Sequence, residues 1–349
     1  MKATYKKHIL NFKVPSGTSR GILKTKETWF IIIENDGKQG IGECGILRGL
    51  SADDRPDYEA QLQYTCNNIE KGLDVLYTEN EEFPSIQIGL EMAFKSLEAK
   101  DPFVLFPSNF TKGNDSIPIN GLIWMGDKSF MNQQIKQKIA DGFDCIKLKI
   151  GAIDFQTELD ILKGIRQNFS ESDIEIRVDA NGAFSIDSAL EKLKRLSDYK
   201  LHSIEQPIQP KQWEDMAKLC ENTPLPIALD EELIGVFNDD KKQELLRVIN
   251  PQYIILKPSF IGGFKGSNTW ITLAEKQNIG WWITSALESN VGLNAIAQYT
   301  YLKGVTMPQG LGTGSLFTNN ISSPLTVKNG TLQYNTNLNW DFNFYLWII

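Results

Sequence analysis

Between residues 106 and 314, short apolar runs alternate with segments whose apolar residues recur at helical spacing. The runs occupy residues 117–124, 145–150, 174–178, 202–204, 227–229, 253–256 and 281–286. The segments between them have one apolar face each; Phe155, Leu159, Leu162 and Ile165 follow the 3.6-residue period of a helix packed on a core. This alternation predicts parallel βα units, arranged either as a doubly wound sheet or as a closed barrel.

The first 105 residues have a different pattern. Strands are expected at 5–14 and 28–34, joined by a loop at 15–21, and a helix is expected near 84–99 with Ser85 as its N-cap. Strands followed by helices indicate an α+β domain. We therefore expect two domains, an α+β domain at 1–105 joined by the C-terminal tail 315–349, and a βα domain at 106–314.

Composition removes several classes of protein. The 349 residues include 36 basic and 43 acidic side chains, so the net charge of −7 provides no cationic field for nucleic acid or anionic lipid. Two histidines are too few for a His-rich zinc site. No apolar run approaches the roughly 20 residues of a membrane span, and no signal-peptide pattern opens the chain. We expect a cytoplasmic protein without nucleic-acid or membrane partners; the oligomeric state stays open.

Charged residues stand at the ends of the expected barrel strands, where a buried run would otherwise stop. They are Lys147, Lys149, Asp179, Glu205, Asp230 and Lys257. From residue 149 onward each follows the previous one by 25 to 30 residues, about one βα unit. A single such residue is often a helix cap or a solvated charge, but six in register predict an active site at the top of a βα barrel.

The three acids lie on consecutive strands, which are about 4.8 Å apart. Carboxylates so close repel one another unless a cation lies between them, and an all-oxygen set suits Mg²⁺ or Mn²⁺ better than Zn²⁺. Lys149 and Lys257 then lie on opposite strands, the second and the sixth. A nearby metal and a second ammonium are expected to lower the pKa of a lysine base toward neutrality. The metal would hold a substrate carboxylate while the α-proton leaves.

These residues resemble the enolase superfamily, and lysines on strands two and six resemble its muconate-lactonizing subgroup. The stretches 18–30, 42–51, 119–126, 257–263 and 285–292 carry the likeness. The resemblance implies a (β/α)7β TIM-like barrel with an α+β capping domain and Mg²⁺ on Asp179, Glu205 and Asp230. It implies Lys149 as the base, Lys257 on the opposite face and Lys147 as support for Lys149. His202 is excluded as a base because it begins strand four and its parity points it away from the site.

Within the subgroup the resemblance implies a small carboxylate substrate and a dehydratase acting on a cyclohexadiene carboxylate. Racemisation of N-acylamino acids or epimerisation of dipeptides is the alternative. Residues 310–314 have no acid where dipeptide epimerases carry an Asp-x-Asp pair, which disfavours an amino-substituted substrate.

Candidate substrate contacts lie in three places. Thr18, Ser19 and Arg20 belong to a capping-domain loop that would close over the substrate, together with the turn around Leu50. Ser285 and the backbone of residues 289–292 could bind a carboxylate at a helix N-terminus.

The glycine-rich stretch 262–266 fits no nucleotide-binding pattern and is expected to be a flexible loop.

Overall fold

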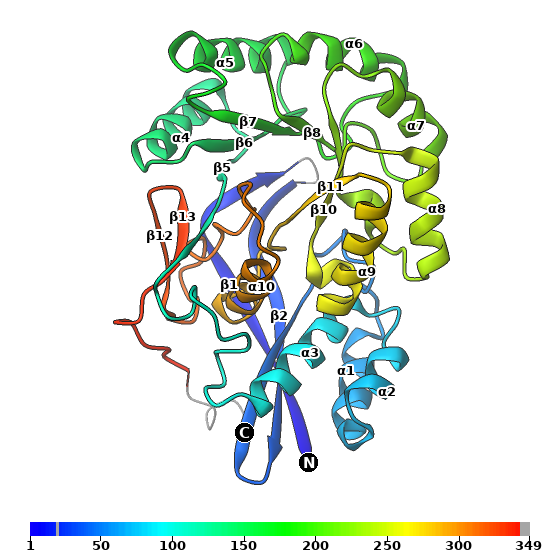
Figure 1. Cartoon of the computed structure of the whole chain (residues 1–349), viewed down its shortest axis with the longest axis vertical. Coiled ribbons are helices and arrows are strands. Elements are labelled where there is room, and N and C mark those ends of the chain that lie inside the picture. Colours follow the sequence, from blue (N-terminus) through cyan, green and yellow to red (C-terminus); the bar gives the residue numbers. More distant parts are fainter. Residues whose placement is uncertain (19–20, 343–349) are drawn as a thin grey trace.

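The computed structural model describes residues 1–18 and 21–342, and it describes no side chains for residues 16–18. In Figure 1 the strands β5–β11 are surrounded by α4–α10, and α1–α3 lie with β1 and β2 at the end that carries the N-terminus. No helix of the described chain is long and apolar enough to cross a membrane.

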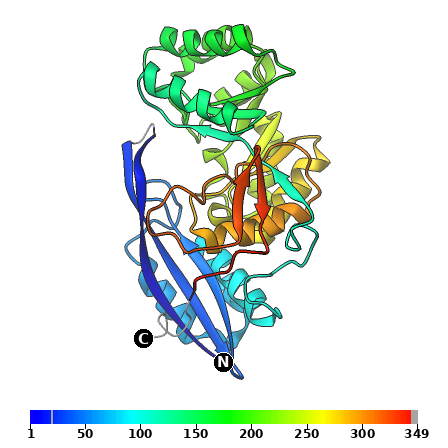
Figure 2. The ribbon, with the colours of Figure 1, turned by 90° about the vertical axis from the view of Figure 1, so that its left-hand side faces the viewer.

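The N-terminal part is an antiparallel sheet covered by helices. Its strands run in the order β1 (Lys2–Thr18), β2 (Gly21–Asn35) and β3 (Lys38–Gly45). Its helices are α1 (Tyr58–Asn67), the 3-10 turn η1 (Ile69–Lys71), α2 (Leu73–Glu79) and α3 (Pro84–Glu98). The two expected strands are confirmed, but both are longer than predicted, and β3 was not predicted. In Figure 2 the long strands β1 and β2 reach from the N-terminal end of the molecule to the level of the barrel.

The alternation of side chains along β2 explains how this sheet packs on both faces. Trp29, Ile31 and Ile33 are buried against α1 and α3, whereas Phe30 and Ile32 are buried with Val291 of the barrel. A strand places successive side chains on opposite faces, so an unbroken apolar run covers two neighbours at once. The sheet is therefore the layer between its own helices and the barrel.

The predicted cap of α3 is wrong. Ser85 is inside the helix, after Pro84, and the preceding Phe83 makes no side-chain cap. The carboxylate of Asp53 instead accepts hydrogen bonds from the backbone N and the Oγ of Ser85, at 2.9 and 2.6 Å. A distant loop therefore satisfies the first backbone N–H of this helix, that of Ser85.

The second part is a barrel of parallel strands and covering helices. Its strands, in the order of both sequence and sheet, are β5 (Gly121–Ile123), β6 (Cys145–Lys149), β7 (Glu175–Asp179), β8 (Ser203–Glu205), β9 (Ile227–Leu229), β10 (Tyr253–Leu256) and β11 (Gly280–Ile283). Its helices are α4 (Lys128–Ala140), α5 (Phe155–Asn168), α6 (Ile186–Ser197), α7 (Trp213–Asn222), α8 (Asp239–Ile249), α9 (Gly263–Lys276) and α10 (Asn290–Leu302). Short 3-10 turns, η2 (Glu231–Leu233) and η3 (Pro258–Phe260), follow β9 and β10.

Residues 309 and 310 close the barrel between its first and last strands. Gln309 forms a parallel bridge with Ile119, and Gly310 forms one with Thr284. The backbone N of Asn120 donates to the carbonyl of Gln309, and that of Ser285 donates to the carbonyl of Gly310, at 3.0 and 2.9 Å. This segment takes the place of an eighth strand, so the (β/α)7β barrel with an N-terminal capping domain is confirmed.

The apolar run at 117–124, expected to be one barrel strand, is two short strands. β4 (Ser116–Pro118) joins an antiparallel sheet with β13 (Thr331–Tyr334) and β12 (Leu325–Lys328), and only β5 belongs to the barrel. Pro118 has no N–H to donate, so it stands at the end of a strand rather than inside one.

The chain after the barrel contacts both parts of the molecule. Phe12 of β1 forms a bridge with Phe317, and the ring of Trp340 stacks on Phe103 with centroids 4.1 Å apart. β12 and β13 cover the start of the barrel through β4. Residues 343–349, including the apolar end of the expected tail, lie outside the described residues, and the boundary at residue 105 stays a prediction.

Candidate active site

The register of the parallel strands places the predicted residues at one level of the barrel mouth. Lys149 pairs with Asp179 across β6 and β7, and Asp179 pairs with Glu205 across β7 and β8. Glu205 pairs with Ala228 on β9, two residues before Asp230. The carboxyl ends of parallel strands meet at one end of a barrel, which is where enzymes with this fold carry their active sites.

The side chains form a row of ammonium and carboxylate groups. The Nζ of Lys149 lies 2.9 Å from Asp179 Oδ2, and the Nζ of Lys147 lies 2.9 Å from the same oxygen. Lys147 also donates to Glu205 Oε2 at 2.5 Å. Beyond Glu205, Asp230 forms an ion pair with Lys257. The row therefore runs from one wall of the barrel to the opposite wall.

Burial and neighbouring charges oppose each other in this row. Burial alone would lower the pKa of Lys147 and Lys257, but the carboxylates around them outweigh it and raise both values. Each of these two lysines thus faces more negative than positive charge, and the lowered pKa expected of a lysine base beside a bound metal stays a prediction.

The carboxylates respond unequally to the same environment. Burial would raise the pKa of Asp179, but Lys147 and Lys149 hold it well below its usual range. Burial and the charge of Asp179 raise the pKa of Glu205 well above its usual range. Lys257 outweighs burial at Asp230 and lowers its pKa. Glu205 is thus the acid whose charge the lysines compensate least.

The donor set suits a divalent cation. The Oε1 atom of Glu205 is buried and has no hydrogen-bond partner among the described residues. An unpaired buried carboxylate oxygen is costly, and a hard cation satisfies it. In the described chain the three carboxylates pair with lysines and form no ready cluster of three acidic, histidine or cysteine side chains. Asp179, Glu205 and Asp230 suit a metal because all three are carboxylates at the same end of the barrel. Their assignment as metal ligands stays a prediction.

A cavity of about 530 Å³ opens above this row. The barrel contributes Lys147, Lys149, Asp179, Asn181 and Lys257 to its wall. The capping domain contributes mainly apolar side chains from the β1–β2 hairpin and from the turn after β3, namely Val14, Ile22, Leu23, Leu47 and Leu50. A ligand in this space would meet ammonium groups at one end and apolar surface at the other.

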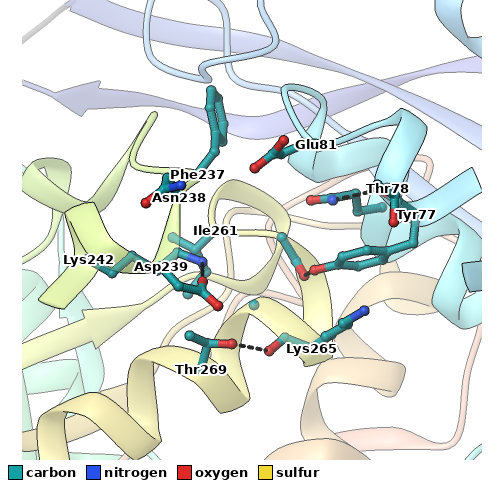
Figure 3. A pocket seen from close by; sticks show the side chains of 13 residues that line it. Tyr77, Thr78, Glu81, Phe237, Asn238, Asp239, Lys242, Ile261, Lys265 and Thr269 are labelled. Carbon is teal, nitrogen blue, oxygen red and sulfur yellow. Dashed lines mark hydrogen bonds and ion pairs between the residues drawn. The ribbon is translucent and has the colours of Figure 1, made fainter.

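A second cavity, of about 340 Å³, lies between α2 of the capping domain and the starts of α8 and α9 (Figure 3). Figure 3 shows Tyr77 beside Ile261 and Lys265, with Asp239 and Lys242 on the other side of the space. Two of its charged side chains pair with each other, with Lys242 Nζ 2.8 Å from Asp239 Oδ1. It contains none of the predicted catalytic residues, so the first cavity is the candidate active site.

The predicted substrate contacts meet different outcomes. Ser19 and Arg20 lie outside the described residues, and Thr18 is described only through its backbone, which pairs with Gly21. Ser285 lines the active-site cavity, and so does Leu50. Arg48, which also lines it, already pairs with Glu27 and Asp54.

The helix N-terminus proposed as a carboxylate site is already filled. Glu43 of β3 accepts hydrogen bonds from the backbone N of Ser289 and of Gly292, each at 2.8 Å, and from Ser289 Oγ at 2.5 Å. A carboxylate from the capping domain thus takes the place predicted for the substrate, because the N-terminus of a helix attracts any nearby anion. The prediction for residues 289–292 is wrong.

The glycine-rich stretch after β10 is likewise an ordered junction rather than a flexible loop. Gly263 begins α9, and Glu91 of α3 accepts hydrogen bonds from the backbone N of Phe264 and Lys265 at 2.6 and 3.0 Å. A Cβ on Gly263 would lie 2.1 Å from Glu91 Oε2. The glycine is needed where the capping domain approaches the barrel backbone.

Asn181 is a site residue that the sequence reasoning missed. Its Oδ1 accepts a hydrogen bond from Lys149 at 2.7 Å, and its Nδ2 donates to Glu231 Oε1 at 2.9 Å. Its φ of 45° lies in the left-handed region, which asparagine tolerates better than most residues. Its place two residues after Asp179 was the available signal, since that spacing brings an amide to the same strand end.

His202 is absent from the site, as expected, but the parity argument is wrong. Its ring lies beside Trp282, which packs with Ala228 and Ile255 on the face that also carries Asp230 and Lys257. Only its place before the start of β8 keeps it from the site. Its ring packs against Tyr253 and Trp282 with centroids 5.0 and 6.1 Å apart, and Nδ1 lies 3.0 Å from Ser203 Oγ. It precedes β8, whereas Glu205 ends that strand. The titratable side chains that the described residues bring to this barrel mouth are therefore lysines and carboxylates.

A capping domain, a (β/α)7β barrel and charged residues on successive strand ends define a known class of enzyme. Residues 131–337 match the sequence family described as enolase C-terminal domain-like, and the chain belongs to the enolase superfamily. Enzymes of this superfamily generally depend on a divalent metal.

Particular relatives narrow the class. The chain is 48% identical to the o-succinylbenzoate synthase of Desulfotalea psychrophila, over 95% of this chain and 98% of that protein. The crystal structure of MenC from the same organism superposes with a TM-score of 0.85 at 44% identity, covering 95% of this chain and 99% of that one. The chain is also 32% identical to the N-succinylamino acid racemase of Thermus thermophilus, over 57% of this chain and 52% of that protein.

Proposed function

We propose that this chain is an o-succinylbenzoate synthase. It would remove water from 2-succinyl-6-hydroxy-2,4-cyclohexadiene-1-carboxylate to give 2-succinylbenzoate, a step of menaquinone biosynthesis in the cytoplasm. The observation that carries the proposal is the pair of cavity lysines on opposite walls, Lys149 and Lys257, joined by the row of carboxylates. The identity of 48% to a synthase over nearly the whole chain supports it.

Lys149 is the proposed base. In its neutral form its Nζ takes the α-proton of the substrate, and the resulting ammonium then returns that proton to the departing hydroxyl, which leaves as water. One residue serves both steps because the proton and the hydroxyl leave from the same face. Asn181 and Asp179, at 2.7 and 2.9 Å, hold the Lys149 amine at the end of β6. Such positioned proton transfer contributes about 10²–10⁴ in rate.

Lys257 and Lys147 are proposed to act through charge. Lys257 lies on the opposite wall, and its raised pKa keeps it an ammonium able to stabilise the negative charge of the enediolate. Lys147 keeps its charge for the same reason and lies between Asp179 and Glu205, where it influences Lys149 electrostatically.

Asp179, Glu205 and Asp230 would hold Mg²⁺, with Mn²⁺ as a possible substitute. When bound, the metal would supply a Lewis acid for the substrate carboxylate. Asp179→Ala and Glu205→Ala should each weaken Mg²⁺ binding, measured by titration calorimetry, as well as turnover. A variant that loses turnover but binds Mg²⁺ as tightly as the parent protein would contradict the ligand assignment.

The cavity wall fits a substrate with two carboxylates and an apolar ring. Gly310, Gly312 and Thr313 line it from the closing segment and contribute no acid that would anchor an amine. Ser285 lies on the same wall, and the capping hairpin is proposed to bring Thr18, Ser19 and Arg20 toward the succinyl carboxylate. A dianionic substrate therefore suits the cavity better than a dipeptide.

The proposal is tested by the ultraviolet absorbance of the cyclohexadiene substrate. With purified protein and Mg²⁺ the absorbance should change as the aromatic product forms, and EDTA should stop the change until Mg²⁺ is restored. An unchanged absorbance with folded protein and saturating Mg²⁺ would overturn the proposed function.

Racemisation of N-acylamino acids is a second candidate, favoured by the 32% identity to an N-succinylamino acid racemase over 57% of this chain. It needs the same two lysines, one on each face of the α-carbon, and the two activities can occur in one enzyme. Exchange of the α-proton of N-succinylamino acids for deuterium would support it. No exchange across a panel of such compounds would remove it.

A further inference from the structure

Beside the end of the row that carries Lys257, a buried acid joins two loops at the barrel mouth, the one after β10 and the one after β11. Glu288 lies between β11 and α10 and is fully buried, with an exposed fraction of 0%. Ser259 Oγ donates to its Oε1 at 2.6 Å, and Ser285 Oγ donates to its Oε2 at 2.7 Å. Ser259 follows Lys257 by two residues, and Ser285 lines the active-site cavity.

The hydroxyl of Ser285 is fully used in this network. It donates its single proton to Glu288, so Thr313 is the donor in the 2.7 Å contact between the two hydroxyls. The backbone N of Leu287 donates to the same Ser285 oxygen at 3.0 Å. Ser285 therefore faces the cavity in one fixed orientation, which Glu288 determines.

A purely structural role explains this arrangement poorly. Burying a carboxylate is expensive even when hydroxyl groups satisfy it, and replacing a buried charged group by an apolar one is often neutral or stabilising. Glu288 also packs against Gly292, where a Cβ would lie 2.9 Å from its side chain. The energetic cost of burying this carboxylate is explained if its two oxygens hold parts of the active site in place.

We infer that Glu288 is a positioning residue that holds the loop of Lys257 and the cavity wall at Ser285 in register. This inference rests on the proposed function for what Lys257 does, but not for the bridge itself. The hydrogen bond to Ser259 fixes the position of the loop that starts at Lys257. The hydrogen bond to Ser285 fixes the surface on which the substrate lies. Glu43 of the capping domain holds the next residue, Ser289, so the bridge also ties the capping domain to this wall.

The test compares Glu288→Gln with the parent protein. A glutamine amide nitrogen cannot accept a hydrogen bond, so one serine loses its acceptor while the shape is kept. We expect kcat to fall by about 10- to 100-fold, the range for a slightly misplaced catalytic group, with a much smaller change in KM. Ser259→Ala removes only the hydrogen bond to the loop of Lys257. In the double variant its effect on kcat should not add to that of Glu288→Gln.

Two controls separate this inference from the proposed function. Glu175→Gln makes the same change in an acid that pairs with Arg177 at the start of β7, the end of the strand away from Asp179, and should leave turnover unchanged. Hydrogen–deuterium exchange, which needs no substrate, should be faster in residues 257–263 and 285–289 of Glu288→Gln but not of Glu175→Gln. Unchanged exchange in these two loops would overturn the bridge, whatever the parent protein catalyses.

If the parent protein does not dehydrate the substrate, only the proposed function is overturned. The exchange measurement still tests whether Glu288 holds the two loops together. If Glu288→Gln does not fold, Ser259→Ala carries both measurements. An unchanged kcat in that variant, together with unchanged exchange at residues 257–263, would overturn the positioning role.

Discussion

Lys147 connects the two halves of the charged row at the barrel mouth. It contacts Asp179 and Glu205 at 2.9 and 2.5 Å, while Lys149 and Lys257 each contact one acid at an end of the row. An ammonium between two carboxylates has a raised pKa and stays charged, so it is poorly suited to take a proton. Lys149 instead donates to one acid, Asp179, and to the amide oxygen of Asn181. The neighbours of Lys147 thus mark it as a supporting charge rather than a base.

The role of Lys149 is tested by Lys149→Ala. Turnover should fall by at least about 100-fold, because positioned proton transfer is lost, while the melting temperature and Mg²⁺ affinity change little. Lys163→Ala, at an exposed position of α5, is the matched control and should behave like the parent protein. If Lys149→Ala keeps a rate near that of the parent, another group is the base.

At the scale of elements, glycines set how closely β3 and α3 pack. A Cβ on Gly42 would lie 1.8 Å from the carbonyl oxygen of Gly89, and a Cβ on Gly89 would lie 2.1 Å from Cys44 Sγ. Because these glycines have no side chains, β3 and α3 pack closely against each other at this point. This contact matters for the site because β3 also carries Glu43 to the start of α10.

Gly42→Ala should lower the free energy of unfolding by about 3 kcal/mol, at the upper end of typical overpacking, since backbone atoms must move. Gly164→Ala is the matched control. Its new methyl group meets nothing within 4 Å in the middle of α5, so it should stabilise the protein by about 0.5–1 kcal/mol. Urea denaturation measures both; equal effects of the two substitutions would contradict the close approach.

Across the whole molecule, the capping domain holds the barrel by two acids at helix N-termini. Glu43 binds the start of α10, and Glu91 binds the start of α9. Tyr77 adds a hydrogen bond from its hydroxyl to the carbonyl of Gly262 at 2.6 Å. α9 and α10 follow the loops that carry Lys257 and Ser285, so the placement of the capping domain and the shape of the cavity are coupled.

This interface makes stability depend on pH. Burial raises the pKa of Glu91 from 4.5 to about 7, so between these values the folded protein binds a proton more tightly than the unfolded chain. Stability from this residue is therefore full below pH 4.5 and falls as the pH rises toward 7. From pH 5 to pH 8 the parent protein should lose roughly 2 kcal/mol more than Glu91→Gln, measured by urea denaturation at both values. Parallel losses in the two proteins would contradict the assignment.

The sequence by itself determined the parallel βα units and the charged residues at the ends of their strands. The helical period and the strand runs are local properties, and the spacing of one βα unit brings Lys149, Asp179, Glu205, Asp230 and Lys257 to one end of any such barrel. Their register in the sheet confirms that level. The resemblance to the enolase superfamily, carried by the same residues, is confirmed by the family match over residues 131–337.

Only the tertiary structure decided which groups meet across long distances in the chain. Glu43 and Ser289 are 246 residues apart, and no local pattern shows that a capping-domain acid fills the helix N-terminus expected for substrate. The closure by residues 309 and 310, the split of 117–124 and the raised pKa of Lys147 likewise depend on partners from distant segments. A period or a spacing reports where one side chain points, whereas the charge and hydrogen bonds it meets depend on what other segments bring to the same place.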